Sequence, residues 1–308
     1  MTRHALVLSA AALALGACKG YVSQDFKEPL KLAGGRTISI AQLESGRDGY
    51  MQYCRPCHGE HGDGKGPASP GLRPPPRDFT AGLFKFAAVA GGSLPHDEDL
   101  VRIVRNGLHG TAMLAWEVPD RRLQDIVQYL KTFSPRWKEE EPGDAITASP
   151  DPWAGKQALG VERGRKLYHG LAQCLGCHPA YASRRQIDAA SRELTGNATT
   201  DFRPDLYGAV LKESDYGSKL LPPDFTRSEL RSIRADQLAE DLYRVIASGV
   251  GGTAMPSWKG SLPEEDIWAL VHYVSSLVES KDTPAADRLL QRNIADDAGS
   301  AGHPQEKP

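Results

Sequence analysis

Two stretches of this 308-residue chain repeat each other closely, and this repeat constrains the fold more than any other feature. Residues 99–113 align without a gap with residues 241–255, and each stretch ends on a methionine with a tryptophan three residues later. Each lies downstream of a Cys-x-x-Cys-His sequence, which begins at Cys54 in one half and at Cys174 in the other. A duplication on this scale predicts two copies of one domain, which also agrees with the chain length.

The Cys-x-x-Cys-His sequence is typical of covalent haem c attachment. Each thiol forms a thioether with a haem vinyl group, and the histidine that follows lies beneath the iron. A Cys-x-x-Cys pair by itself also suits a redox-active dithiol or half of a zinc site. Zinc is disfavoured because the two pairs lie 120 residues apart in the sequence. The sequence therefore predicts two haem c groups, attached at Cys54 and Cys57 and at Cys174 and Cys177, with His58 and His178 as proximal iron ligands.

Met113 and Met255, which close the two repeated stretches, are the predicted sixth ligands of the irons. Apolar residues at helical spacing precede each of them, and Gly107 and Gly249 suit a helix end. A small-residue loop would then deliver each methionine. A lone methionine is usually core filler. His/Met ligation, by contrast, raises the reduction potential of a haem and closes the coordination position that catalysis needs.

Further matches extend the repeat to the rest of each half. The triplet Asp-Phe-Thr at 78–80 recurs at 224–226, each time after a run of prolines. Helical patterns are expected over 41–53 and 158–172, before the attachment motifs, and again from Pro119 and from Pro263.

With these motifs, the chain resembles a dihaem member of the class I cytochrome c family over about residues 41–135 and 155–280. The resemblance implies an all-α fold of two tandem class I cytochrome c domains, each a few helices wrapped around one covalently bound haem. In that family the first and last helices cross at the haem edge. A proline carbonyl after the motif often accepts a hydrogen bond from the proximal histidine, and Pro67 is the candidate in the first half.

The N-terminus predicts a lipoprotein signal peptide over residues 1–17. Residues 5–17 carry no charge and are too short to span a bilayer. They end in Leu-Gly-Ala before Cys18, which resembles a bacterial lipobox whose cysteine is acylated. An ordinary signal peptide with an incidental cysteine is the alternative. Lipidation of Cys18 predicts a protein on the periplasmic side of the cell envelope, anchored to the inner or the outer membrane.

The remaining boundaries follow from the repeat and from local composition. We expect a lipid-anchored tether over 18–40, domains over 41–135 and 157–280, a linker over 136–156 and a disordered tail over 281–308. In the second domain the Asp-Phe-Thr triplet begins 46 positions after the motif histidine, against 20 in the first. The resulting insertion over 180–222 is either a surface loop or a docking lobe or lid beside the second haem.

Several other residues are candidates for contact with haem. Arg77 and Arg227 flank the two triplets and are candidates for the haem propionates, with plain solvation as the alternative. Trp116 and Trp258 are candidates for packing on haem, with core packing as the alternative. His109, four residues before the first predicted methionine ligand, is its weaker rival.

These features favour an electron-transfer protein. The net charge of −2 offers no basic excess for nucleic acid. We expect transfer of single electrons between periplasmic or membrane respiratory partners, such as a membrane oxidase, a quinol-oxidising complex or a small soluble cytochrome. The alternative is a dihaem enzyme of the peroxidase or thiosulfate dehydrogenase type, which needs one haem with an open position. Two equivalent methionines argue against it, and the insertion in the second half leaves it open.

Overall fold

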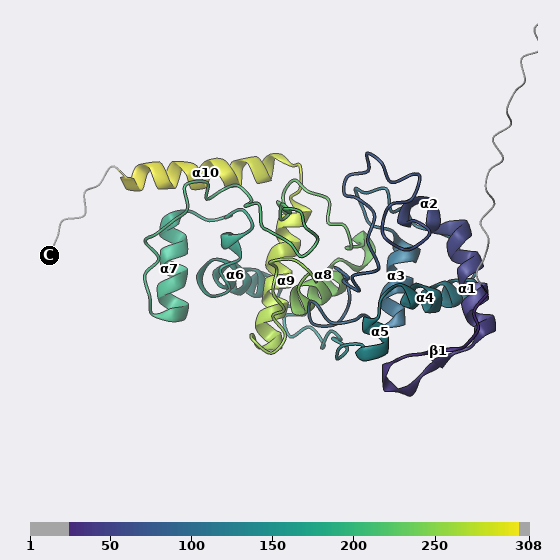
Figure 1. Ribbon diagram of the computed structural model, residues 1–308. Helices are drawn as coiled ribbons and strands as arrows, with labels where there is room; N and C mark the ends of the chain where they lie inside the picture. Colours follow the sequence, from purple (N-terminus) through teal and green to yellow (C-terminus); the bar gives the residue numbers. More distant parts are fainter. Residues whose placement is uncertain (1–24, 302–308) are drawn as a thin grey trace, which may run out of the picture.

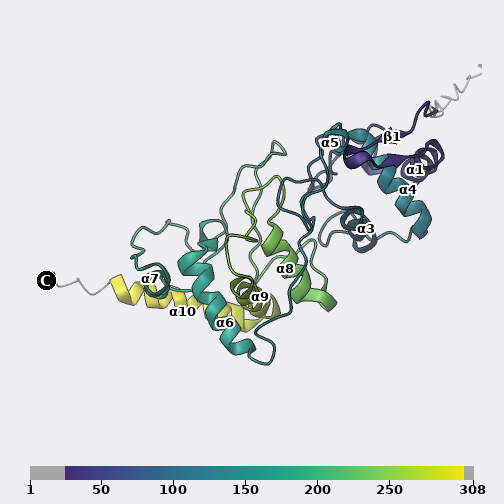
Figure 2. The ribbon, with the colours of Figure 1, turned by 90° about the horizontal axis from the view of Figure 1, so that it is seen from below.

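The computed structural model describes residues 25–301, and the two halves of the chain lie side by side (Figure 1, Figure 2). Helices dominate these residues, as the all-α prediction requires, and the named strands form one short hairpin. No helix within residues 25–301 is long and apolar enough to cross a membrane. The predicted signal peptide and Cys18 lie outside the described residues.

The first half is organised around the crossing of α1 (Ile40–Tyr53) and α4 (Asp120–Leu130). Pro119 precedes α4 as its N-cap, as the sequence predicts. The helices approach so closely at Gly46 that a Cβ atom there would lie 2.1 Å from the carbonyl oxygen of Asp125. Glycine is therefore needed at this crossing. The predicted apolar face of α4 is buried and comprises Leu123, Ile126, Val127 and Leu130. The other elements are η1 (Ala33–Gly35), α2 (Arg55–His58), α3 (Asp97–Asn106), η2 (Lys131–Phe133) and α5 (Arg136–Glu139).

The second half repeats this crossing with α6 (Gln157–Lys166) and α9 (Glu264–Glu279). A Cβ atom at Gly164 would lie 1.9 Å from the carbonyl oxygen of Ala269, so glycine is needed here too. Helix α6 continues into a π-helical turn, Leu167–Leu171. The other elements are η4 (Cys174–Gly176), α7 (Arg184–Thr195), η5 (Ala235–Gln237), α8 (Leu238–Ser248) and α10 (Pro284–Ala301).

Each repeated stretch opens on a buried aspartate that fixes the loop before it. Asp99 and Asp241 each accept a hydrogen bond at 2.9 Å from a backbone N–H of the preceding loop. Each carboxylate also pairs with the arginine three residues later, and Asp241 pairs in addition with Arg234. Burial by itself raises the pKa of Asp241, but the hydrogen bonds from Arg234 and Arg244 outweigh it and hold the pKa below its usual value.

The predicted tether is wrong for the residues that the structure describes. Residues 30–38 form a hairpin of β1 (Leu30–Lys31) and β2 (Thr37–Ile38). Leu30 and Ile38 are buried and pack with Leu43 of α1. The hairpin is therefore part of the first half, because it covers apolar surface of the first helix.

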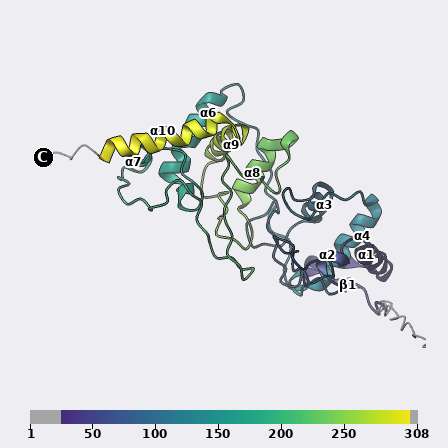
Figure 3. The ribbon, with the colours of Figure 1, turned by 90° about the horizontal axis from the view of Figure 1, so that it is seen from above.

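The predicted disordered tail is also wrong for residues 284–301, which form α10. Figure 1 and Figure 3 show α10 next to α7, and in Figure 1 it runs across one end of that helix. Asp297 on α10 accepts hydrogen bonds at 2.7 Å from the Arg184 guanidinium and from the Tyr207 hydroxyl. Its polar composition suggested disorder, but these charged side chains meet partners in the insertion.

The linker over 136–156 is held by both halves. Trp137 is buried in the core of the first half. Gly143 donates its N–H to the carbonyl of Leu94 at 3.0 Å, and the indole of Trp268 in the second half donates to the carbonyl of Ser149 at 3.1 Å. The linker therefore fixes the halves to each other along its length.

Candidate haem sites

Both Cys-x-x-Cys-His sequences fold into a single turn. The N–H of His58 donates to the carbonyl of Cys54 at 2.9 Å, and the N–H of His178 donates to the carbonyl of Cys174 at 2.9 Å. The first turn is α2 and the second begins as η4. None of the four motif cysteines, namely Cys54, Cys57, Cys174 and Cys177, forms a disulfide. Each half thus presents two thiols and one histidine on one turn.

The first cysteine of each pair lies in an apolar environment. Burial raises the pKa of Cys54 to about 12, and it raises the pKa of Cys174 to about 12 as well. These thiols stay protonated at neutral pH. A redox-active dithiol needs a reactive thiolate, so this environment disfavours that alternative. Within residues 25–301 no three His, Cys, Asp or Glu side chains gather to hold a metal ion, which disfavours a zinc site.

Each motif histidine is oriented by the same two contacts. The Nδ1 atom of His58 lies 3.0 Å from the carbonyl oxygen of Arg77, and Nδ1 of His178 lies 2.9 Å from that of Pro223. Phe79 stacks on the first ring with centroids 4.5 Å apart, and Phe225 stacks on the second at 4.8 Å. Burial lowers the pKa of both imidazoles. With Nδ1–H donated to a carbonyl, Nε2 is the nitrogen left to bind a metal.

This geometry corrects the prediction that Pro67 accepts the histidine hydrogen bond. The acceptor is the residue just before the Asp-Phe-Thr triplet, which is Arg77 in the first half and Pro223 in the second. The triplet itself forms a tight turn, because the aspartate accepts hydrogen bonds from the backbone N–H and the hydroxyl of the threonine. The triplet therefore recurs because it places one carbonyl and one phenyl ring on the histidine.

The two methionine loops share a hydrogen-bond pattern. In the first, Leu108 N–H donates to the carbonyl of Met113 at 2.7 Å, the Thr111 hydroxyl donates to the carbonyl of Leu108 at 2.7 Å, and that hydroxyl accepts from Met113 N–H at 3.1 Å. The second loop repeats these bonds with Val250, Thr253 and Met255 at 3.2, 2.7 and 3.2 Å. Both loops therefore hold their methionine in the same way.

Glycine is required where each of these loops begins. Gly107 ends α3 with φ of 64°, and Gly249 ends α8 with φ of 71°, in the region that side chains disfavour. A Cβ atom at Gly107 would lie 2.6 Å from the backbone nitrogen of Ala115. The returning loop thus passes directly over the helix end. Both glycines end their helices, as the sequence predicts.

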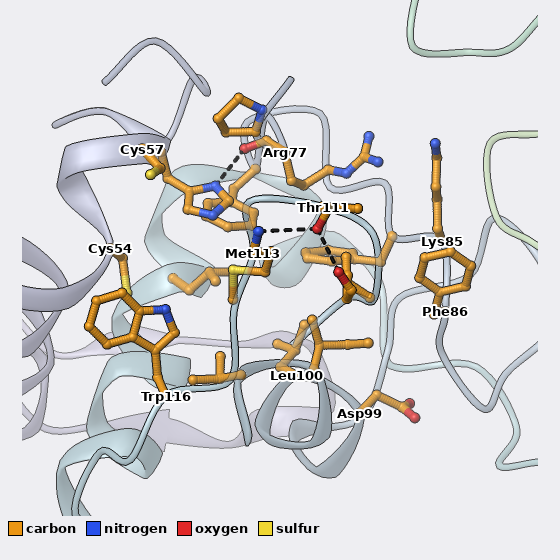
Figure 4. A pocket seen from close by; sticks show the side chains of 18 of the residues that line it. Cys54, Cys57, Arg77, Lys85, Phe86, Asp99, Leu100, Thr111, Met113 and Trp116 are labelled. Carbon is orange, nitrogen blue, oxygen red and sulfur yellow. Dashed lines mark hydrogen bonds between the residues drawn. The ribbon is translucent and has the colours of Figure 1, made fainter. Parts of the chain in front are cut away.

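In the first half these groups meet at one cavity. Its volume is about 1580 Å³, including the space at its open mouth, and apolar side chains dominate its lining. Cys54, Cys57, His58 and Met113 all border it, and Figure 4 shows the two cysteines and the methionine around it. Asp99 and Arg77 are among the few charged residues in the lining.

In the second half the corresponding residues lie in one core. Cys174 and Met255 both pack against the second apolar cluster, and His178 is buried with Phe225. The structure thus brings the predicted site residues of the first half to one cavity, and in the second half it places Cys174 and Met255 against the same apolar core.

The residues present fit a covalently attached haem. Each half offers two unpaired thiols on one turn and a neutral histidine with Nε2 available, and in the first half the adjoining cavity is apolar and holds the thioether of Met113. Haem needs these features for vinyl attachment, axial ligation and burial of its porphyrin.

Comparison with known proteins agrees with this geometry. The family model described as "Cytochrome C oxidase, cbb3-type, subunit III" matches residues 41–130 and 160–274, which is more than half of the chain. The chain belongs to this family. The resemblance to dihaem c-type cytochromes is thereby confirmed, and the two matched segments coincide with the two halves of the structure.

Two relatives of this c-type cytochrome are informative. Cytochrome c4 of Stutzerimonas stutzeri is 27% identical over 175 residues, covering 55% of this chain and 76% of the relative. A chain from the reducing HAO-like protein complex of Kuenenia stuttgartiensis is 30% identical with a TM-score of 0.59, and the match covers 76% of this chain and 96% of that one.

The other candidate contacts have mixed outcomes. Arg77 and Trp116 border the first cavity, whereas Arg227 pairs with Asp287 at the surface and Trp258 packs against the second core. His109 is exposed and does not line the cavity. Arg231, which the sequence analysis did not single out, reaches the first cavity from the second half. No local sequence pattern marks Arg231, because the cavity it lines belongs to the other half of the chain.

Proposed function

We propose that this c-type cytochrome is a dihaem electron carrier with both irons held by one histidine and one methionine. His58 and Met113 would hold the first iron, and His178 and Met255 the second. When bound, haem c supplies one-electron chemistry. The surrounding chain fixes the tautomer of each histidine, holds each methionine and surrounds the first site with apolar side chains.

The observation that carries this proposal is the equivalence of the two methionine loops. The same three hydrogen bonds hold both loops, and the same carbonyl and phenyl contacts hold both histidines. An enzyme needs one iron with an exchangeable position, and neither loop departs from its counterpart in a way that would free one. Equivalent closed sites suit outer-sphere electron transfer.

The location and partners of the carrier extend this proposal. Lipidation of Cys18 would tether it to a membrane on the periplasmic side, near a membrane oxidase, a quinol-oxidising complex or a small soluble cytochrome. The tether would raise its effective concentration at such partners. The similarity to a cytochrome c4 supports the carrier role. We expect no nucleic acid among the partners, because the net charge of −2 offers no basic excess.

A second candidate is a dihaem cytochrome that serves as part of a larger redox enzyme. The similarity to a chain of a reducing HAO-like protein complex favours it. The same two sites would then work inside a permanent assembly, or one of the haems would be reactive.

Carbon monoxide binding to the reduced holoprotein tests the carrier proposal. We expect two haem c per chain, both low-spin and neither binding carbon monoxide. Met113→Ala and Met255→Ala should each open one site, so that half of the haem responds. Carbon monoxide binding by the unsubstituted protein would contradict closed ligation and favour the enzyme. Closed ligation would also be contradicted if either alanine variant bound no carbon monoxide, because the substituted methionine would then not be an iron ligand.

A further inference from the structure

The tip of the insertion in the second half reaches the first haem site. Residues 212–220 form a narrow turn closed by paired backbone hydrogen bonds between Lys212 and Leu220 at 2.9 and 2.8 Å. Tyr216 lies at its tip. Its hydroxyl donates to the carbonyl of Gly251 at 2.8 Å, and Asp215 N–H donates to the carbonyl of Gly252 at 3.1 Å. The tip is thus fixed to the loop that delivers Met255.

The ring of Tyr216 faces two cations of the first half. The guanidinium carbon of Arg77 lies 3.7 Å from the ring centroid, and Nζ of Lys85 lies 4.8 Å from it. Both distances are within the range of a cation–π interaction. Figure 4 shows Arg77 and Lys85 next to each other at the side of the cavity. Arg77 is also the residue whose carbonyl orients His58.

Three cations from the two halves gather at this rim. Arg77, Lys85 and Arg231 all line the first cavity. Burial lowers the pKa of Arg77, and the nearby Tyr216 ring and Asp78 carboxylate partly offset this effect. Burial, together with the nearby charges of Arg77 and Arg231, lowers the pKa of Lys85 to about 8. Keeping these cations together costs free energy, and the face of the Tyr216 ring is the group of the second half that offsets it.

We propose that Tyr216 is a positioning residue for the first haem site, through which the second half sets the positive charge beside the first haem. The ring holds Arg77 and Lys85 at the rim of the first cavity, and the hydroxyl ties them to the Met255 loop. Positive charge near a haem favours its reduced form, because reduction adds an electron. This inference rests on haem being bound, as proposed above, and assigns a role to an insertion that the sequence left open.

The test is an equilibrium redox titration of the holoprotein carrying Tyr216→Leu. Without the ring, the two cations turn toward water and are screened, so the potential of the first haem should fall. We expect its reduction constant to decrease threefold to tenfold, where tenfold corresponds to about 59 mV for one electron. The second haem should change by less than twofold. Met113→Ala identifies the first haem, because it perturbs only that spectrum.

Two further variants separate positioning from simple anchoring. Tyr216→Phe keeps the ring and loses the hydrogen bond to Gly251. The potential of the first haem in this variant should therefore equal that of the unsubstituted protein. Tyr207→Leu is the matched control: this tyrosine also lies in the insertion, but its hydroxyl contacts Asp297 on α10. Tyr207→Leu should leave the reduction potentials of both haems unchanged.

Two results would overturn the inference. One is an unchanged first potential in Tyr216→Leu, and the other is an equal shift of both haems. If Tyr216→Leu fails to fold, Lys85→Gln decides, since it must lower the first potential alone. These equilibrium potentials do not depend on whether the protein is a carrier or an enzyme, so carbon monoxide binding can fail while this inference stands.

Discussion

Substitution of Gly164 by alanine should destabilise the second half strongly. A Cβ atom there would lie 1.9 Å from the carbonyl oxygen of Ala269 and 2.8 Å from Cβ of Tyr273. An ordinary carbon–oxygen contact is about 3.3 Å, so α6 and α9 would have to separate by roughly 1.4 Å. The obstacle is helix backbone, which cannot rotate aside as a side chain does.

The magnitude follows from two opposing effects. Overpacking costs about 1–3 kcal/mol, and a rigid obstacle places this site near the upper value. Alanine favours the helix over glycine by about 1 kcal/mol, which leaves a net loss of about 2 kcal/mol. For a domain of about 100 residues each kcal/mol lowers Tm by about 4–8 °C, so the transition should fall by about 8–16 °C.

Thermal unfolding of the holoprotein, followed by circular dichroism in the haem region, measures this loss. Gly299→Ala is the matched control, because Gly299 lies on α10 and a Cβ atom there meets nothing within 4 Å. It should leave Tm unchanged or slightly higher. A Gly164→Ala protein as stable as its parent would refute the close crossing of α6 and α9.

Three further predictions concern the site and the docking of α10. Thr111→Val removes the hydroxyl that holds the Met113 loop, so methionine binding to the first iron should weaken about fivefold, by about 1 kcal/mol, measured as carbon monoxide uptake by that haem alone. Asp241→Asn should cost about 3 kcal/mol in urea unfolding at pH 7. The pKa of Asp241 is depressed in the folded state, so its carboxylate stabilises the protein above the usual carboxyl pKa near 4, and this stabilisation is lost as the pH falls. The unfolding free energies of parent and variant should therefore converge in acid. A difference that stays constant with pH would contradict an ionised Asp241. Asp297→Ala removes acceptors for Arg184 and Tyr207 and should raise amide exchange in α10 about tenfold, whereas unchanged exchange would show that other contacts hold this helix.

Much of each site follows from short-range pattern. The attachment turn spans five residues, and each methionine loop is closed by bonds between residues at most five apart. Such geometry depends on local backbone preference and on glycine at the helix end. For this reason the sequence pattern predicted the helices that follow Pro119 and Pro263 and the meeting of thiols, histidine and methionine at the first cavity. The all-α class followed from the resemblance to class I cytochromes c.

Contacts between distant segments could not be predicted in this way. The acceptor for His58 lies 19 residues further along the chain and that for His178 lies 45, so the sequence suggested Pro67 instead of Arg77. A backbone carbonyl carries no signature of residue type, and any residue can supply it.

The sequence by itself determined that this chain carries two equivalent Cys-x-x-Cys-His turns, because side-chain chemistry and spacing are local properties. Only the tertiary structure decided that α10 docks on the insertion and that Tyr216 reaches across to Arg77 and Lys85. Those contacts depend on how two folded halves pack, which reflects shape and charge over the whole molecule. The polar, aperiodic segments of the sequence therefore proved to be those that join its parts.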